Sequence, residues 1–540
     1  MKLRITSALI IVLLIFSFHV LNNYSIVTKD SIPFVYDAAG YFETSLEVYR
    51  LFRLKSFLQN PLEVFSLYTR IFDWRPPLFM IAPYPYYMFF GRSMDVAQMS
   101  NSTFLLVLIV SIYLIGKKLR DEKAGLLAAF IVTSFPIIFG FSRLYWADFA
   151  LTAMVSLSIC LLLYTENFRS RNVSILFGIS LGLGALTKLS FVGFIIGPLF
   201  YCLIEAVHFR DYRIRLNHFL IALLLGVVIM SGWYIPNIKL IWRHFMMSSF
   251  AGIGRPSSFF SAIGFYVKGL FSIQLYPSYF FIFALCVVYS FVIKAPKTFL
   301  LVWFLVPYLF NIAVSINPRI YRYLLPVLPS IGLYIALTIY ELKYRKLKTL
   351  VWPLVLLGLV QFYLLSYTDY GWCKTTNFPW ERFKSGGLLK AARQDWDVKE
   401  IVSVFDKERV VKNRSPIKIV VLASSGIIPS ILQCWQAMED IPVELDFPIN
   451  LDNALHHFTK EEYYVRILNK EYILGFDYVF SVEDRGQVIA EQKRALLKRL
   501  RMIFNSNVSR FKLLRTIGLP QGMVLSIYEK RRVEEGNSAT

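Results

Sequence analysis

The sequence predicts a polytopic α-helical membrane protein with a C-terminal α/β domain outside the membrane. Of its 540 residues, 56% are hydrophobic and only 17% are charged, and the mean hydropathy is +0.51. A soluble chain usually carries about 25% charged residues. Apolar runs long enough to span a bilayer recur up to residue 367 and not beyond it. We therefore expect a membrane domain, 1–367, and a soluble domain, 368–540.

Apolar runs of about 15–20 residues mark about eleven spans, within a range of about 10 to 13. The first run follows Lys2 and Arg4 as in a signal peptide, but no A-x-A-like cleavage site follows, so we expect an uncleaved span. The segment 76–90 is short and broken by Pro, which favours a re-entrant or interfacial helix. The expected spans are 5–27, 97–115, 124–141, 149–165, 174–188, 189–206, 218–235, 279–293, 298–316, 323–341 and 349–367.

The loops indicate the orientation, because cytoplasmic loops carry an excess of Lys and Arg. The basic loops alternate correctly if the N-terminus is cytoplasmic and the short segment 174–188 crosses the membrane. The tail then lies outside, with the loops 28–96, 142–148, 236–278 and 317–322. The basic loops are 116–123, 168–172, 208–218, 294–297 and 343–348. The net charge of +22 gathers in such loops rather than in a basic stripe, which argues against a nucleic-acid partner.

The soluble tail has the pattern of a small α/β domain. Segments 416–426, 476–484 and 523–530 predict strands, and 491–504 predicts a helix. We find no phosphate-binding loop or nucleophile elbow there. The five cysteines lack metal-type spacing, and the two in the tail, Cys373 and Cys434, are either a disulfide or two free thiols.

The first outer loop is long, and long structured loops often carry function. Its segment 43–65 alternates apolar and basic residues, which predicts a helix lying at the membrane interface. Glu43 and Glu47 lie one helical turn apart and are interpreted as a polar helix face.

Several charged residues lie at or near the predicted outer face, where charge is expensive and indicates function. Taken singly, each has a structural explanation: a helix cap for an Asp, a solvated loop acid, or a cation whose stem lies along the interface. Together they place two acids and several bases on one side. The set is Asp37, Arg75, Arg143, Asp148, Lys188, Arg319 and Arg322.

This combination suits the transfer of a group from a lipid-phosphate carrier. Arg and Lys bind phosphate and stabilise its charge as it leaves. A carboxylate acts as a general base toward a hydroxyl or an amine. We therefore expect a phosphate-binding transferase site at the outer membrane face.

The order of these features resembles the GT-C glycosyltransferases of the protein-mannosyltransferase and lipid A aminoarabinose-transferase type, a glycosyltransferase family 39-like group. The motifs that carry the resemblance are VYDAAGYF, WRPPLF, SRLYWADFALTAM, GLGALTK and RYLLPVLP, all within 1–367. The resemblance implies a GT-C-like fold and an inverting transfer of a sugar from a polyprenyl phosphate to a lipid, glycan or protein acceptor. Family members commonly add an outer soluble domain.

The resemblance also implies roles for residues. Asp37 would be the general base, and Asp148 would shape the site or bind the acceptor. Arg75 would contact the carrier phosphate. The remaining members of the expected substrate- and phosphate-binding set are Tyr41, Arg143, Lys188, Arg319 and Arg322.

The chain departs from the family pattern at one place. Many relatives carry a second acid beside the first-loop Asp, but Ala38 and Ala39 follow Asp37 here. We therefore predict no metal ligands and no cofactor. Two other functions remain open, namely a transporter or flippase for lipid-linked sugars and a non-catalytic assembly subunit. The expected partners are a polyprenyl-phosphate sugar, an unknown acceptor and the bilayer, at a bacterial inner membrane.

Overall fold

The computed structural model describes most of the chain and divides it into two compact units. The first unit comprises Met1–Asp30, Val48–Trp242 and Ala251–Ala392, and the second comprises Ser31–Glu47, Arg243–Phe250 and Arg393–Thr540. The described residues are 7–54, 61–250, 259–295, 297–313, 320–342, 349–368, 396–404, 416–423, 426–439, 443–448, 466–483 and 491–531. The predicted domain boundary after residue 367 adjoins a stretch outside these ranges and stays a prediction.

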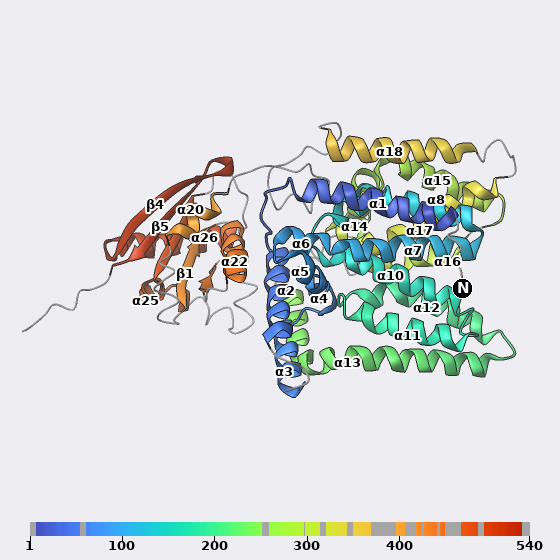
Figure 1. Ribbon diagram of the computed structural model, residues 1–540, viewed down its shortest axis with the longest axis horizontal. Coiled ribbons are helices and arrows are strands. Elements are labelled where there is room, and N and C mark those ends of the chain that lie inside the picture. Colours follow the sequence, from blue (N-terminus) through green and yellow to red (C-terminus); the bar gives the residue numbers. More distant parts are fainter. Residues whose placement is uncertain are drawn as a thin grey trace, which may run out of the picture. The chain divides into compact units, whose positions relative to one another are not determined.

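Helices make up the first unit (Figure 1). Helix α2 crosses the division, because its residues up to Glu47 belong to the second unit. The helices are α1 (Ser7–Val27), α2 (Asp37–Leu54), α3 (Pro61–Ile71), α4 (Leu78–Ile81), α5 (Tyr84–Phe90), α6 (Met94–Met99), α7 (Asn101–Leu119), α8 (Glu122–Thr133), α9 (Pro136–Ser142), α10 (Ala147–Tyr164), α11 (Arg171–Ala185), α12 (Phe191–Val207), α13 (Tyr212–Phe250), α14 (Phe259–Gly269), the π-helix η1 (Leu270–Gln274), α15 (Tyr276–Val292), α16 (Thr298–Ala313), the 3₁₀-helix η2 (Tyr321–Val327), α17 (Leu328–Glu341) and α18 (Val351–Tyr367).

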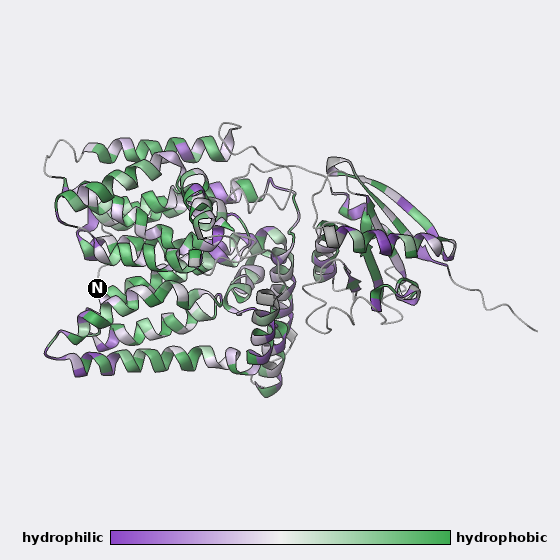
Figure 2. Cartoon of the chain, turned by 180° about the vertical axis from the view of Figure 1, so that it is seen from behind, coloured by the Kyte–Doolittle hydropathy of each residue, from purple (hydrophilic) through white to green (hydrophobic). Residues whose placement is uncertain are grey.

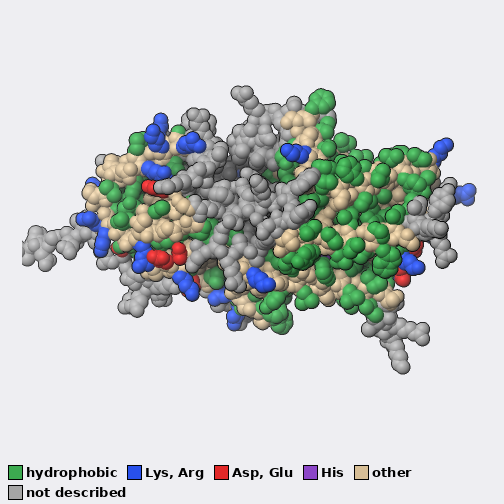
Figure 3. Space-filling model, turned by 90° about the horizontal axis from the view of Figure 1, so that it is seen from above, with side chains coloured by type: hydrophobic (Ala, Val, Ile, Leu, Met, Phe, Trp, Pro, Cys, Tyr) green, Lys and Arg blue, Asp and Glu red, His purple; other side chains and the backbone are tan. Residues whose placement is uncertain are grey.

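These helices confirm a polytopic membrane protein. Among the described residues, five helices are long and apolar enough to cross a membrane, and two bent helix pairs pass the same test when each pair is counted as one span. Four shorter apolar helices, α11, α12, α16 and α18, occupy the remaining predicted spans. Hydrophobic residues predominate along the helices of this unit (Figure 2), and many large hydrophobic side chains are exposed on its surface, as lipid contact requires (Figure 3).

The segment predicted to be re-entrant or interfacial forms two short helices, α4 and α5. Phe89 and Phe90 at the end of α5 are 83% and 73% exposed. Large apolar side chains with such exposure are typical of helices that lie in a lipid interface.

The centre of the helical unit is close-packed. The apolar windows of α10 and of η2–α17 are 78% and 89% buried. A β-carbon on Gly116 would lie 2.6 Å from the Cα of Gly125, so α7 and α8 cross at a distance that only glycine permits.

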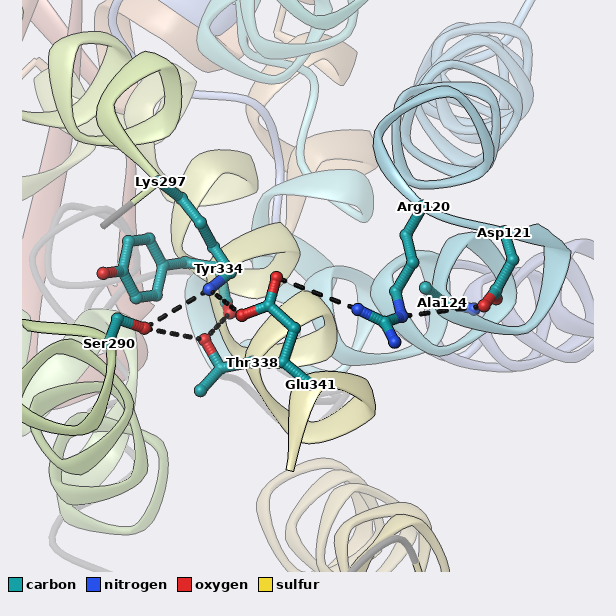
Figure 4. A network of polar contacts seen from close by, with 8 residues as sticks. All are labelled: Arg120, Asp121, Ala124, Ser290, Lys297, Tyr334, Thr338 and Glu341. Atoms are coloured by element: carbon teal, nitrogen blue, oxygen red, sulfur yellow. Dashed lines mark hydrogen bonds and ion pairs between the residues drawn. The ribbon is translucent and has the colours of Figure 1, made fainter. Parts of the chain in front are cut away.

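Contacts between polar residues join loops that were predicted to lie on one side of the membrane. Lys118 pairs with Glu166 at 2.7 Å, and the Arg215 guanidinium donates to the Glu166 carbonyl at 2.6 Å. Glu341, at the end of α17, contacts Lys297 at 2.6 Å and Arg120 at 3.8 Å (Figure 4). Four of the five basic loops thus adjoin one end of the helix bundle, and 343–348 lies outside the described residues. The orientation of this end in the membrane stays a prediction.

A five-stranded sheet forms the core of the second unit, with order β2-β1-β3-β5-β4. Strands β2, β1 and β3 are parallel, whereas β5 is antiparallel to both β3 and β4. Leu422 and Val479 of the sheet pack with Leu497 and Leu500 of α26. The elements are α20 (Val398–Ser403), β1 (Ile417–Leu422), α22 (Ile427–Glu439), β2 (Val443–Asp446), α25 (Lys470–Leu474), β3 (Tyr478–Glu483), α26 (Glu491–Ser506), β4 (Phe511–Leu519) and β5 (Met523–Lys530).

The predicted strands correspond to β1, β3 and β5, and the predicted helix corresponds to α26. The alternatives for the two tail cysteines stay open, because Cys434 is buried and Cys373 lies outside the described residues.

Candidate functional site

A buried carboxylate braced by two cations lies at the start of α10. Asp148 is 2% exposed and stands in the first turn of that helix. Its Oδ1 accepts a hydrogen bond from Lys188 Nζ at 2.6 Å, and its Oδ2 lies 3.4 Å from Arg322 Nε. Two cations for one carboxylate leave a net positive charge, which favours the binding of an anion.

Each cation comes from a chain turn rather than from the middle of a helix. Lys188 lies in the turn between α11 and α12, where Thr187 donates its backbone N–H to the Gly184 carbonyl at 3.0 Å. Arg322 lies in the 3₁₀-helix η2, with its guanidinium 4.0 Å from the centre of the Trp146 ring. This stacking fixes the guanidinium plane beside Asp148.

Gln274 supports the Arg322 segment and was not predicted from the sequence. The Gln274 side chain is fully buried at the end of the π-helix η1 and donates to the Tyr321 carbonyl at 2.8 Å. Phe265 stacks on the Tyr321 ring with centroids 4.3 Å apart. π-Helical turns are frequent at functional sites. The one feature of the sequence that points to Gln274 is that it is a lone amide side chain in an apolar run.

Arg75 lies in a segment that is tied to the same region. Its guanidinium lies 5.0 Å from the centre of the Trp74 ring. Three residues later, the Leu78 backbone N–H donates to the Leu186 carbonyl at 2.8 Å, close in sequence to Lys188. The structure therefore links the Arg75 segment to the turn that carries Lys188.

Arg143 makes a different set of contacts. It is 3% exposed, and its Nε donates to Asn23 Oδ1 at 3.0 Å. The guanidinium lies 5.1 Å and 5.0 Å from the centres of the Phe139 and Phe362 rings. Within the described part of the chain, its two terminal nitrogens have no hydrogen-bond partner, and its contacts do not include the Asp148 cluster. Its expected role in substrate or phosphate binding stays a prediction.

Asp37 belongs to the second unit and is the first residue of α2. It is partly exposed, and the N-terminus of a helix stabilises negative charge. Tyr41 lies one helical turn later on the same side of α2. Arg319 lies outside the described residues, so its predicted role is not tested.

Ala38 and Ala39, which stand where many relatives carry a second acid, are closely packed. Ala38 and Ala39 are 3% and 0% exposed, so a longer carboxylate there would need to displace its neighbours. Across the described ranges, no group of three or more His, Cys, Asp or Glu side chains could hold a metal ion. The expectation that no metal or cofactor is used stays a prediction.

The chain shows similarity to known proteins in sequence and in fold. Residues 75–235 match the model of the family described as dolichyl-phosphate-mannose-protein mannosyltransferase. This segment contains Arg75, Asp148 and Lys188. No curated protein sequence matches the chain.

Solved structures resemble the chain over nearly its whole length. ArnT from Cupriavidus metallidurans, bound to undecaprenyl phosphate, matches with a TM-score of 0.61 at 11% identity, covering 96% of this chain and 97% of that one. AglB, the oligosaccharyltransferase of Archaeoglobus fulgidus, in complex with an inhibitory peptide and a dolichol phosphate, matches with a TM-score of 0.50 at 10% identity, covering 96% and 74%. These matches confirm the predicted GT-C-like fold, in which the C-terminal region of this chain contains a small sheet.

Proposed function

We propose that this chain, which has the fold of the GT-C glycosyltransferases, transfers a sugar from a polyprenyl-phosphate carrier to an acceptor at the outer membrane face. The observation that carries the proposal is the Asp148 carboxylate held between Lys188 and Arg322. A carboxylate that served only to cap α10 would not need two cations beside it.

The cations would stabilise the phosphate that leaves the sugar. As the bond between the anomeric carbon and the phosphate oxygen breaks, a second negative charge develops on the phosphate. Lys188 is 25% exposed at its side chain, so its ammonium remains accessible while Asp148 holds it in place. Arg75 would contribute a further contact to the carrier phosphate. Donors already in position stabilise the developing charge without rearrangement.

Asp37 would act as the general base. An ionised Asp37 would accept the proton of an acceptor hydroxyl or amine as its oxygen or nitrogen attacks the anomeric carbon. The carrier leaves as polyprenyl phosphate, and the single displacement inverts the anomeric configuration. Tyr41, on the same side of α2, would contact the substrate.

Two features of known proteins support the donor class. ArnT was solved with undecaprenyl phosphate, and AglB with a dolichol phosphate. Both ligands are polyprenyl phosphates, and both proteins share this fold. The family description of the segment 75–235 also names a dolichyl-phosphate sugar.

A donor panel tests the proposal against the transporter alternative. Purified protein is reconstituted in vesicles with radiolabelled hexoses and pentoses linked to undecaprenyl or dolichyl phosphate, and an envelope extract supplies acceptors. We expect label to leave one carrier and appear in a new glycosidic bond, with Arg322→Gln much slower and the exposed-site variant Lys512→Gln unchanged. Movement of intact donor across the bilayer without bond formation would support a transporter and overturn the proposal.

A further inference from the structure

The residue before Asp37 has a backbone conformation that needs external support. Tyr36 has φ +55°, in the left-handed region that a residue with a side chain adopts only at a cost. It immediately precedes the first turn of α2, so its conformation sets the direction in which that helix, with Asp37, begins. Other groups of the second unit must therefore hold Tyr36 in place.

Helix α22 of the soluble domain supplies that support. The Tyr36 backbone N–H donates to Ser430 Oγ at 3.0 Å, and Ser430 is only 5% exposed. The Tyr36 ring lies over Gly426, where an added β-carbon would be 2.9 Å from ring carbon Cε1. Gly426 therefore allows the ring to approach closely, and a side chain at this position would displace it, while Ser430 anchors the backbone of the same residue.

A second contact fixes α2 further along. The Glu43 carboxylate accepts a hydrogen bond from Gln433 Nε2 at 2.6 Å and another from Gln436 Nε2 at 2.8 Å. Ser430, Gln433 and Gln436 are spaced three residues apart, so they lie on one face of α22. Two amides on the two oxygens of one carboxylate restrain both the rotation and the position of the helix that carries it.

We propose that this face of α22 positions the start of α2, so that the soluble domain sets the orientation of Asp37 during transfer. Ser430, Gln433, Gln436 and Gly426 are thus positioning residues. The inference rests on the proposed function, in which Asp37 is the base. It gives the C-terminal domain a role in the reaction that needs no substrate contact of its own.

Two substitutions test the inference with matched controls. Ser430→Ala removes the acceptor for the Tyr36 N–H, and Ser506→Ala changes an exposed serine whose hydroxyl donates within its own helix. Gly426→Ala pushes on the Tyr36 ring, and Gly518→Ala adds a β-carbon with nothing within 4 Å. The conservative variant Ser430→Thr keeps the hydroxyl.

The first readout needs no substrate. Hydrogen–deuterium exchange of full-length protein in nanodiscs should show the first amides of α2 exchanging about fivefold faster in Ser430→Ala, as loss of one hydrogen bond predicts. The same amides should also exchange faster in Gly426→Ala, which displaces the Tyr36 ring. The strands of the soluble sheet should exchange as in the wild type. Equal exchange at the start of α2 in the variants and their controls would overturn the inference.

The second readout is transfer from the polyprenyl-phosphate donor that the wild type uses. A catalytic group displaced by about 1 Å can lose about 100-fold in rate. We expect kcat to fall at least about tenfold in both variants with an unchanged KM for the donor, and Ser430→Thr to recover most of the rate. In an Asp37→Asn background, Ser430→Ala should cause no further loss.

The two proposals fail in different ways. If Asp37→Asn transfers sugar at the wild-type rate, the assignment of the base is wrong, and the positioning inference falls with it. If Asp37→Asn is inactive while Ser430→Ala and Gly426→Ala keep the kcat of their controls, only the role of α22 is refuted.

Discussion

The Asp148 ion-pair cluster yields a prediction that separates a buried interaction from a surface one. Asp148→Asn keeps the shape of the side chain and removes its charge, which leaves Lys188 and Arg322 near one another without an anion. Breaking a buried pair by removing one partner destabilises a protein by about 3–5 kcal/mol. Since the Lys188 side chain is 25% exposed, we expect about 3 kcal/mol, at the lower end of that range.

The measurement is thermal inactivation of detergent-solubilised protein, followed as loss of the monodisperse peak after heating. A loss of about 3 kcal/mol corresponds to about 3 °C in a chain of this size, since the unfolding entropy is about 2.1 cal/mol/K per residue. The control is Glu122→Gln, which breaks the Lys117–Glu122 pair at 2.7 Å, with side chains 44% and 49% exposed. Exposed pairs contribute about 0–1 kcal/mol, so this control should inactivate within about 1 °C of the wild type.

A double variant identifies the cause. Asp148→Asn with Lys188→Met removes one uncompensated cation as well, so it should regain most of the lost thermal stability. It should not regain sugar transfer, because the phosphate would lose a cation. If Asp148→Asn inactivates at the same temperature as Glu122→Gln, the Asp148 pair is screened by solvent, and the buried cluster that carries the proposed function is refuted.

Three further predictions follow from other parts of the molecule. Gly125→Ala places a β-carbon 2.3 Å from the Tyr113 carbonyl oxygen and should abolish the yield of folded protein. The control Gly193→Ala, whose added β-carbon has no heavy atom within 4 Å, should express normally. Equal yields of the two variants would contradict the close crossing of α7 and α8. Gln274→Leu should lower kcat about tenfold by freeing the η2 backbone next to Arg322, and a wild-type rate would remove the supporting role of η1. Burial raises the pKa of Asp446 above its ordinary value of 3.8, so ionisation of Asp446 destabilises the folded state as pH rises past that value. Asp446→Asn should therefore slow hydrogen exchange of β2 at pH 7 and leave it unchanged at pH 3. Slower exchange at both pH values would contradict this pH dependence.

The membrane spans could be predicted from sequence because hydropathy is a local property. Most expected runs correspond to a single helix, and even the short segment 174–188 largely forms α11, which runs from the basic-loop end of the bundle to the turn of Lys188. The bend of 72° between α8 and α9 was not predicted, since the 124–141 run is apolar throughout.

The soluble domain was predicted less completely. Strand β2 has only four residues, too few for a clear alternation. Strand β4 is an edge strand whose register shifts between Leu513 and Arg515, which disturbs the period of two. The central strands of the sheet, β1 and β3, were predicted because both of their faces are buried and apolar.

Single charged residues of the site were found from sequence, but their partners were not. Asp148, Lys188 and Arg322 are far apart in the chain, and only the tertiary fold shows that they form one ion-pair cluster. Glu43 was interpreted as part of a polar helix face, whereas it receives two amides from α22. A single sequence carries no signal for such a pairing, because neither Gln is unusual in a soluble helix.

The most direct test of the central claim is single-turnover sugar release from the radiolabelled polyprenyl-phosphate donor that the wild type uses, comparing Asp37→Asn with the wild type and with Asp73→Asn as a matched acid control. Folding of each variant is checked by its inactivation temperature. We predict that the wild type and the control transfer label, and that Asp37→Asn retains the donor intact at least about 100-fold longer. Release by Asp37→Asn at the wild-type rate would contradict the account.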